Sequence, residues 1–223
     1  MITSVDSDGA VTVLLDMAES VRSNVDYLTK LDSQLGDGDH GYNLERGFAQ
    51  VRASLSGFKG DDVGALLESI GNTLMSSMGG ASGPLFGAAF SAAGRAVKGK
   101  EVRVIDVAAM LEAAEREVVS LGAAKVGDKT MLDSLHPAAV AARKASAEGS
   151  DMVAAFASIV AAAESGLEST KGLVAKKGRA MYLGERGVGA YDVGAASVCV
   201  ILRSALETLK RMNEGSRAAV RPA

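Results

Sequence analysis

Apolar residues recur at the spacing of an α-helix along almost the whole chain. Five segments carry this pattern most strongly and span residues 11–28, 63–78, 104–121, 152–167 and 198–212. Apolar side chains three or four positions apart lie on one face of a helix, so each segment predicts an amphipathic helix. Weaker segments of the same kind span residues 42–56, 83–97 and 132–147. The alternation typical of a β-strand is hard to find, and we expect an all-α fold of about eight helices.

Two of the weaker segments have marked starts. Ser82 stands two residues ahead of Pro84, which places a capping hydroxyl just before a first-turn proline. Thr130 and Asp133 have the spacing of a capping box at the start of the third weak segment. Because no linker divides the chain, we expect one domain over residues 1–223, with a polar, frayed tail at residues 213–223.

Composition and charge exclude several classes of protein. Hydrophobic residues make up 48% of the 223 residues, which is typical of a globular domain with a real core. The formal net charge of −3 gives no reason to expect a nucleic-acid partner. The single cysteine, Cys199, excludes an intramolecular disulfide and fits the reducing cytoplasm. The apolar run 152–163 is shorter than the roughly 20 residues of a membrane span, and the acidic N-terminus shows no export signal.

An acidic, glycine-rich loop is the most informative stretch of the chain. It reads Leu31-Asp-Ser-Gln-Leu-Gly-Asp-Gly-Asp-His-Gly41 and contains the carboxylates of Asp32, Asp37 and Asp39. Packed in one loop, these groups would repel one another unless a cation balances them. Oxygen ligands suit Mg²⁺ or Ca²⁺ rather than zinc, and the pattern of an EF-hand is not met. The spacing alone fits equally well a solvated acidic loop whose aspartates cap the next helix.

Other glycine-rich loops suggest anion binding. Gly79-Gly-Ala-Ser-Gly-Pro84 opens a helix with free N–H groups, which favours a phosphate, although an ordinary serine cap gives the same pattern. Gly127-Asp-Lys-Thr130 is no P-loop because an aspartate interrupts the required order. Arg179 suits the stabilisation of charge that develops on a phosphoryl group, although most surface arginines have no such role. Together these groups fit the positioning and charge neutralisation that phosphoryl transfer requires.

Four long motifs then identify a family resemblance. They are the loop 31–41, Gly79-Gly-Ala-Ser-Gly-Pro-Leu85, Gly127-Asp-Lys-Thr-Met-Leu-Asp133 and Lys177-Gly-Arg-Ala-Met-Tyr-Leu-Gly-Glu-Arg186. In this order and spacing they resemble subunit L, the nucleotide-binding domain of dihydroxyacetone kinases, over nearly the whole chain. The resemblance implies a closed barrel of eight antiparallel amphipathic helices with the nucleotide site on the loops at one end.

The resemblance also implies the cofactors and the residues of the site. It implies ADP or ATP together with two Mg²⁺ ions held by Asp32, Asp37 and Asp39, and it gives Arg179 the role of stabilising the transferred phosphoryl group. The implied nucleotide contacts are His40, Gly41, Asn43, Ala81, Ser82, Gly122, Thr130, Met131, Arg179, Tyr191 and Asp192. His136 and the stretch 187–191 depart from the typical family pattern.

In this family the reaction is divided between polypeptides. A separate K subunit holds the ketose, and the L subunit brings the phosphoryl donor. In one branch a phosphotransferase-system M subunit rephosphorylates a retained ADP, and in the other ATP exchanges as the donor. The resemblance therefore implies a kinase subunit that acts with a K-type partner. The alternative is a regulatory module that signals the state of its nucleotide to another protein, and the sequence does not separate the two.

Overall fold

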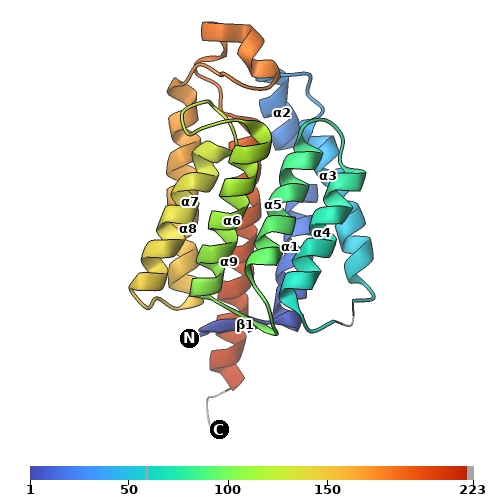
Figure 1. Cartoon of the computed structure of the whole chain (residues 1–223), viewed down its shortest axis with the longest axis vertical. Helices are drawn as coiled ribbons and strands as arrows, with labels where there is room; N and C mark the ends of the chain where they lie inside the picture. Colours follow the sequence, from blue (N-terminus) through green and yellow to red (C-terminus); the bar gives the residue numbers. More distant parts are fainter. Residues whose placement is uncertain (59, 220–223) are drawn as a thin grey trace.

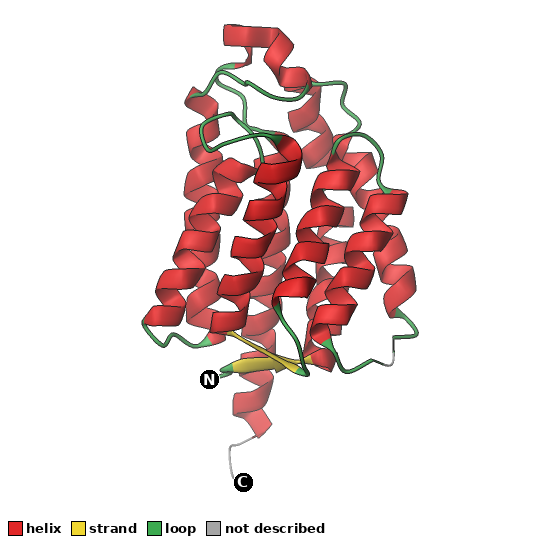
Figure 2. Cartoon of the chain, viewed as in Figure 1, coloured by secondary structure: helices red, strands yellow, loops and turns green. Residues whose placement is uncertain are grey.

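Helices dominate the computed structural model, which describes residues 1–58 and 60–219 (Figures 1 and 2). The α-helices are α1 (Ser7–Ser23), α2 (Val25–Leu35), α3 (His40–Leu55), α4 (Val63–Ser77), α5 (Ser82–Ala96), α6 (Val104–Gly122), α7 (Leu132–Ala147), α8 (Met152–Ser169) and α9 (Val193–Ala219). Two 3-10 helices, η1 (Thr170–Gly172) and η2 (Arg179–Gly187), lie between α8 and α9. The predicted helical fold is confirmed.

The long helices run side by side and pack mainly against their neighbours in the chain (Figure 1). The succession of contacts passes from α1 to α3, then through α4, α5, α6, α7 and α8 to α9, and α9 packs back against α1. Helix α2 packs against α3 and α9 at one end of this ring. The apolar stripes predicted from the sequence therefore face a shared interior.

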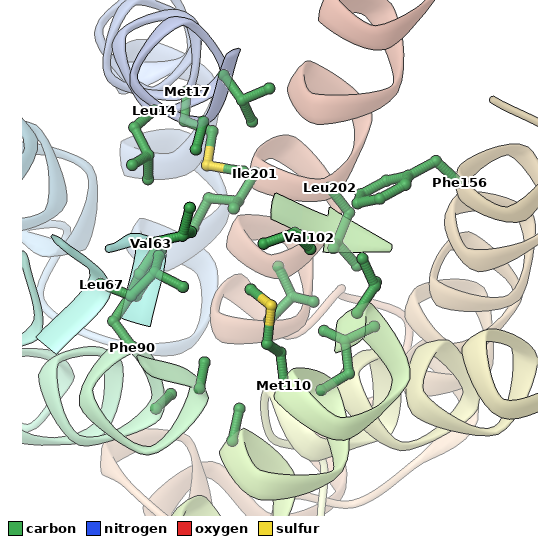
Figure 3. A pocket seen from close by; sticks show the side chains of 18 of the residues that line it. Leu14, Met17, Val63, Leu67, Phe90, Val102, Met110, Phe156, Ile201 and Leu202 are labelled. Carbon is green, nitrogen blue, oxygen red and sulfur yellow. The ribbon is translucent and has the colours of Figure 1, made fainter. Parts of the chain in front are cut away.

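An apolar cavity of about 180 Å³ lies in this interior. Every residue that lines it is apolar, and Figure 3 shows Leu14, Val63, Phe90, Met110 and Phe156 around it. A cavity without polar partners for water is expected to be dry. Because side chains from helices at both ends of the chain meet here, the interior joins the N- and C-terminal halves into one unit.

The structure departs from the sequence prediction at three places. The expected first helix, 11–28, is divided at Asn24, whose φ of −109° and ψ of 10° depart from helical values and whose side-chain Nδ2 donates back to the carbonyl of Ser20 at 2.8 Å. Two strands of three residues, β1 (Ser4–Asp6) and β2 (Glu101–Arg103), pair antiparallel and are too short to show an alternating pattern. Helix α9 continues through the expected frayed tail as far as Ala219, and Met212 packs against the core. Residues 220–223 lie outside the described residues.

Helix α8 needs separate mention because of its apolar composition. The stretch Met152–Gly172 is long and apolar enough to span a membrane by those two measures alone. In the fold, however, α8 packs against α7 and α9 and buries Met152, Ala155 and Ile159 in the core. The core helix of a globular protein can have the same composition.

Helices α4 and α5 approach each other through glycines. A Cβ atom on Gly71 would lie 2.5 Å from the carbonyl oxygen of Gly87, and a Cβ on Gly94 would lie 2.5 Å from the carbonyl oxygen of Gly64. The two backbones are therefore nearly in contact at two points, and these points lie seven residues apart along each helix. This contact fixes the position of the loop that joins α4 to α5, which carries Gly79 to Ala81.

The glycine contact leads to a stability prediction. We expect Gly71→Ala to lower the free energy of unfolding by about 1–3 kcal/mol, because an added methyl group must push the two helices apart. Urea unfolding followed by circular dichroism measures the change. Gly215→Ala is the control, because Gly215 lies in α9 and a Cβ on it would have nothing within 4 Å, and there alanine should be neutral or stabilising by up to about 1 kcal/mol. Equal effects of the two substitutions would contradict the packing argument.

Candidate functional site

Three aspartates converge where α2 ends and α3 begins. Asp32 lies in the last turn of α2, and Asp37 and Asp39 lie in the loop that follows. Each of them offers one carboxylate oxygen, and these three atoms lie within 4.8 Å of one another. The structure therefore brings together the three residues that the sequence predicts as metal ligands.

The buried carboxylate of Asp32 organises this loop. Its Oδ2 accepts the backbone N–H groups of Asp39, at 3.0 Å, and of His40, at 3.1 Å. Gly36 is required beside it, because a Cβ at that position would lie 2.5 Å from Asp32 Oδ1. Gly38 has a φ of +76°, a backbone conformation that favours glycine. The glycines of the motif thus let the chain fold back onto the aspartate.

The charges of the loop are only partly balanced within the protein. The guanidinium of Arg179 forms an ion pair with Asp37, with Nη2 2.9 Å from Oδ2. Arg179 reaches Asp37 from η2, and its side chain is 71% exposed. Three carboxylates against one arginine leave a net negative cluster, which favours a bound cation. A set of three carboxylate oxygens fits Mg²⁺, which binds oxygen ligands and keeps water or phosphate in its remaining positions.

His40 lies beside the aspartates and links three helices. Its Nε2 is 2.8 Å from the hydroxyl of Ser197 on α9, and its Nδ1 is 3.0 Å from the hydroxyl of Ser82 on α5. Burial lowers the pKa of His40, while the negative charges of Asp32 and Asp39 oppose that shift. Burial therefore favours the neutral form of the ring.

The bonds of the two serines assign the proton in this neutral form. The hydroxyl of Ser197 donates to the carbonyl of Val193, so it accepts from Nε2–H of His40. Nδ1 is then the acceptor, and the hydroxyl of Ser82 donates to it. This arrangement leaves the lone pairs of the Ser82 oxygen to face other donors. Ser197 was missed by the sequence analysis, because it lies in an apolar helix far from every motif.

The loop from Gly79 to Ala81 leads into the N-terminus of α5. In the described part of the chain no side chain caps this helix, which begins at Ser82, so its first N–H groups are available to an anion. Asn43 lies against the loop, since a Cβ on Gly79 would be 2.7 Å from Asn43 Oδ1. Arg46 holds that amide in place by donating to Oδ1 at 3.0 Å. The structure thus places the predicted residues Asn43, Ala81 and Ser82 at one helix end.

Gly41 has a structural reason to be glycine. A Cβ at this position would overlap the carbonyl oxygen of Val25 and would lie 2.5 Å from Oγ1 of Thr29. Helix α3 therefore packs closely against α2 at the same point where the acidic loop closes. A contact between Gly41 and a nucleotide remains a prediction.

The loop between α6 and α7 and its two ends contain three more of the predicted nucleotide contacts. Gly122 is the last residue of α6, and a Cβ on it would lie 3.5 Å from Leu85 in the first turn of α5. Asp133 accepts the N–H of Gly127 at 2.6 Å and that of Thr130 at 2.7 Å, although α7 begins at Leu132 with Met131, rather than the predicted Thr130, as its N-cap. Met131 is buried and lines the internal cavity. Its predicted contact with a nucleotide base stays a prediction.

Tyr191 and Asp192 precede α9. The hydroxyl of Tyr191 donates to Glu168 at 2.6 Å, and the ammonium of Lys171 lies 4.3 Å from the centre of its ring. Asp192 accepts the N–H of Ala195 at 2.7 Å and so caps α9. Burial raises the pKa of Asp192 to about 7, against the effect of the Ala195 N–H, which favours the ionised form. The carboxylate of Asp192 and the side chain of Met131 both lie close to Gly194, since a Cβ there would be 3.1 Å from the first and 3.2 Å from the second.

Comparisons with known proteins identify the family of the chain. The family model described as the DAK2 domain matches residues 34–207. The chain is 40% identical over 202 residues to the ADP-binding subunit DhaL of PEP-dependent dihydroxyacetone kinase 2 from Listeria innocua, covering 89% of this chain and 93% of that protein. It is also 40% identical over 179 residues to the corresponding subunit from Escherichia coli, covering 80% and 85% of the two chains.

A solved structure shows the same fold. The crystal structure of the dihydroxyacetone kinase from C. freundii in complex with AMP-PNP and Mg²⁺ matches with a TM-score of 0.70 at 22% identity. The match covers 93% of this chain and 35% of that longer chain. The chain thus belongs to the DAK2 domain family and, over most of its length, is similar to the ADP-binding subunits of dihydroxyacetone kinases.

Proposed function

We propose that this chain is the ADP- or ATP-binding subunit of a kinase that phosphorylates dihydroxyacetone or a related small ketose. The observation that carries the proposal is the meeting of three carboxylates and Arg179 close to the open N-terminus of α5. Such a combination fits a nucleotide whose phosphates are held together with metal ions. The names of the two ADP-binding relatives support the same function.

The metal ligands in this proposal are Asp32, Asp37 and Asp39, which would hold two Mg²⁺ ions. Asp32 uses Oδ2 for two backbone N–H groups and retains Oδ1 as a further acceptor. Bound Mg²⁺ would offset the negative charge that the phosphate oxygens carry during transfer. The protein itself contributes a loop that is already closed by hydrogen bonds, so the ligands need little rearrangement.

The nucleotide would lie between the acidic loop and the N-terminus of α5. The first N–H groups of that helix, beginning with the backbone N–H of Ser82, would bind phosphate oxygens, and Asn43 lies beside the same turn. Arg179 would face the transferred phosphoryl group. The remaining contacts that we propose are His40, Gly41, Ala81, Gly122, Thr130, Met131, Tyr191 and Asp192.

The reaction needs a second polypeptide in this proposal. The bond between the terminal phosphorus and its bridging oxygen breaks and leaves ADP, while a hydroxyl oxygen of the ketose forms the new bond to phosphorus. The proton of that hydroxyl passes to a base of the partner. The partner is a K-type subunit that holds the ketose, because the carboxylates and arginine described above serve the phosphates rather than a sugar.

The relatives also indicate the source of the phosphoryl group. Both ADP-binding subunits belong to kinases named as PEP-dependent. We therefore propose that ADP is retained as a coenzyme and is rephosphorylated by a phosphotransferase-system M subunit. A cytoplasmic location follows from this role and fits the single free thiol of Cys199.

The fold proposal completes this picture. The ring of neighbours from α1 through α9 is a closed barrel of eight antiparallel helices, with α2 as an added element at the nucleotide end. The return of the contacts from α9 to α1 supports it. Closure would keep the loops of this end at fixed distances from one another.

The metal assignment predicts the effect of one substitution. Asp37→Asn should weaken ADP binding in Mg²⁺ by about 10-fold or more, because it removes a charged ligand from the cation. Titration calorimetry in Mg²⁺ and in EDTA measures the effect, which should disappear in EDTA. Asp61→Asn is the control, since Asp61 is an exposed aspartate paired with Lys100 in another loop. Unchanged affinity of Asp37→Asn in Mg²⁺ would remove Asp37 from the metal site.

Arg179 should affect the rate of transfer more than the affinity for the nucleotide. Arg179→Lys keeps the charge but loses the planar fork that binds two oxygens at once. We expect nucleotide affinity to change by only about 3-fold and transfer to slow by about 10²-fold, as when an electrostatic stabiliser of a transition state is lost.

The experiment combines a binding isotherm with a transfer assay at saturating K subunit. Arg186→Lys is the matched control, because Arg186 is exposed on the same 3-10 helix and, within residues 1–58 and 60–219, donates only to the carbonyl of Leu183 at 3.4 Å. A collapse of affinity together with rate would make Arg179 a ground-state ligand. Wild-type values for both would make it an ordinary surface arginine.

The division of labour gives a further prediction. The isolated chain with ATP and Mg²⁺ should not phosphorylate dihydroxyacetone, and addition of a K-type subunit should start the reaction. Product formation is followed by a coupled assay for the phosphorylated ketose. Strong activity of the isolated chain would disprove the division, while nucleotide binding without transfer in the presence of K would favour the regulatory alternative.

A further inference from the structure

The segment that carries Arg179 contacts the rest of the protein at its two ends and, through Arg179 itself, at Asp37. We call residues 173–187 the cover segment, and it lies over the helix ends as the orange segment at the top of Figure 1. Its middle is open to solvent, with Tyr182 79% exposed. Gly178 and Gly184 have φ angles of +62° and +56°, and nothing lies within 4 Å of a Cβ on either. The position of Arg179 therefore depends on its ion pair with Asp37 and on whatever holds the two ends of the segment.

The side chain of Lys129 binds both ends at once. Its Nζ donates to the carbonyl of Leu173 at 3.2 Å and to that of Gly187 at 2.7 Å, and these are the first and the last residue of the cover segment. Lys129 is only 1% exposed, which is rare for a lysine. Its backbone φ of +59° lies in the left-handed region, an unfavourable conformation for a residue with a side chain. Such an unfavourable placement is retained only where the surrounding structure needs it.

A lysine suits this position for a chemical reason. A nitrogen on a long stem can donate to two carbonyl oxygens that come from separate turns of the chain. Burial lowers the pKa of Lys129, while the charge of Asp192 opposes the shift. In either protonation state the nitrogen keeps at least two N–H groups, so both bonds survive.

Further contacts connect the ends of the cover segment to the helix that carries a proposed metal ligand. The N–H of Lys176 in the cover segment donates to the carbonyl of Asp128, the residue before Lys129, at 3.0 Å. Gly187 packs against Leu35 at the end of α2, since a Cβ on Gly187 would lie 3.2 Å from the leucine side chain. Asp32 lies in that same last turn of α2. The end held by Lys129 is thus also the end that rests on the helix bearing a metal ligand.

We propose that Lys129 is a positioning residue whose two hydrogen bonds close the base of the cover segment and hold Arg179 at the carboxylate cluster. The effect of Lys129 on transfer rests on the proposed function, whereas the tie, by which we mean its two hydrogen bonds to the ends of the cover segment, does not. In the sequence, Lys129 stands in Gly127-Asp-Lys-Thr130, which is no P-loop because of the aspartate, and in the structure its nitrogen binds protein carbonyls instead.

The tie is tested by hydrogen exchange on the intact chain, followed by mass spectrometry. In Lys129→Met, amides of residues 173–189 should exchange about 10-fold faster or more, on the scale of a lost buried hydrogen bond, while amides of α4 and α5 keep their wild-type rates. Lys129→Gln keeps one donor group and should give an intermediate rate. Lys98→Met, which removes an exposed lysine after α5, should change nothing.

The role in transfer is tested on the same variants. With a K-type subunit, Lys129→Met should lower kcat by about 10-fold or more and leave the affinity for ADP and Mg²⁺ within about 3-fold, because Arg179 is misplaced while the metal ligands remain. Lys129→Gln should recover part of kcat.

Each result has a defined meaning. If amides of residues 173–189 exchange at wild-type rates in a folded Lys129→Met, Lys129 does not hold the cover segment. If amides exchange faster over the whole chain in both Lys129→Met and Lys129→Gln, Lys129 is a general core residue, and the proposal is overturned as well. A loss of nucleotide affinity equal to the loss of kcat overturns the positioning role. Absence of transfer by the wild-type chain would disprove the proposed function, and the exchange result would still decide whether the tie exists.

Discussion

The two hydrogen bonds that Asp32 accepts from the backbone of Asp39 and His40 set the geometry of the whole loop end. A buried carboxylate needs partners, and here they are N–H groups seven and eight residues further along the chain. Satisfying them forces the chain through a tight glycine turn, starts α3 at His40 and leaves Asp37 and Asp39 beside the carboxylate. The same bonds therefore build the cation site and the first turn of the helix that carries His40.

From His40 the constraint passes to helices that are distant in sequence. The imidazole lies between hydroxyl groups of α5 and α9, so the start of α5 is held against the start of α3. The close glycine contacts between α4 and α5 also restrict the position of the loop that joins these two helices. The end of the ring thus behaves as one framework, in which the metal ligands and the open N-terminus of α5 keep a fixed relation. Phosphoryl transfer benefits from such a framework, since it depends on positioning more than on a nucleophile.

Charge is distributed unevenly over this framework. The carboxylates lie in the closed loop, the buried ring of His40 lies next to them, and the arginine that pairs with Asp37 comes from an exposed segment. The closed part of the site is therefore acidic, and the positive charge is supplied from outside the ring. A cover that is held at its base and open in its middle can bring that charge to a phosphate and still release the product.

The amino-acid sequence by itself determined the helical class, most helix positions and the acidic cluster. Helical periodicity is a local property, and three aspartates within eight residues lie close together in almost any turn, so neither conclusion required the tertiary fold. The division of the first helix at Asn24 and the short strands escaped the pattern because a few local bonds decide them.

Only the tertiary structure decided which distant residues complete the site. Ser197 stands in an apolar helix and Lys129 in a failed motif, and both gain their partners because helices and loops far apart in the chain are packed together. Met131 shows the opposite case, since a motif residue turns towards the core cavity. Contacts of this kind depend on where whole helices come to rest, and that position is set by the sum of all packing in the ring, which no short stretch of sequence contains.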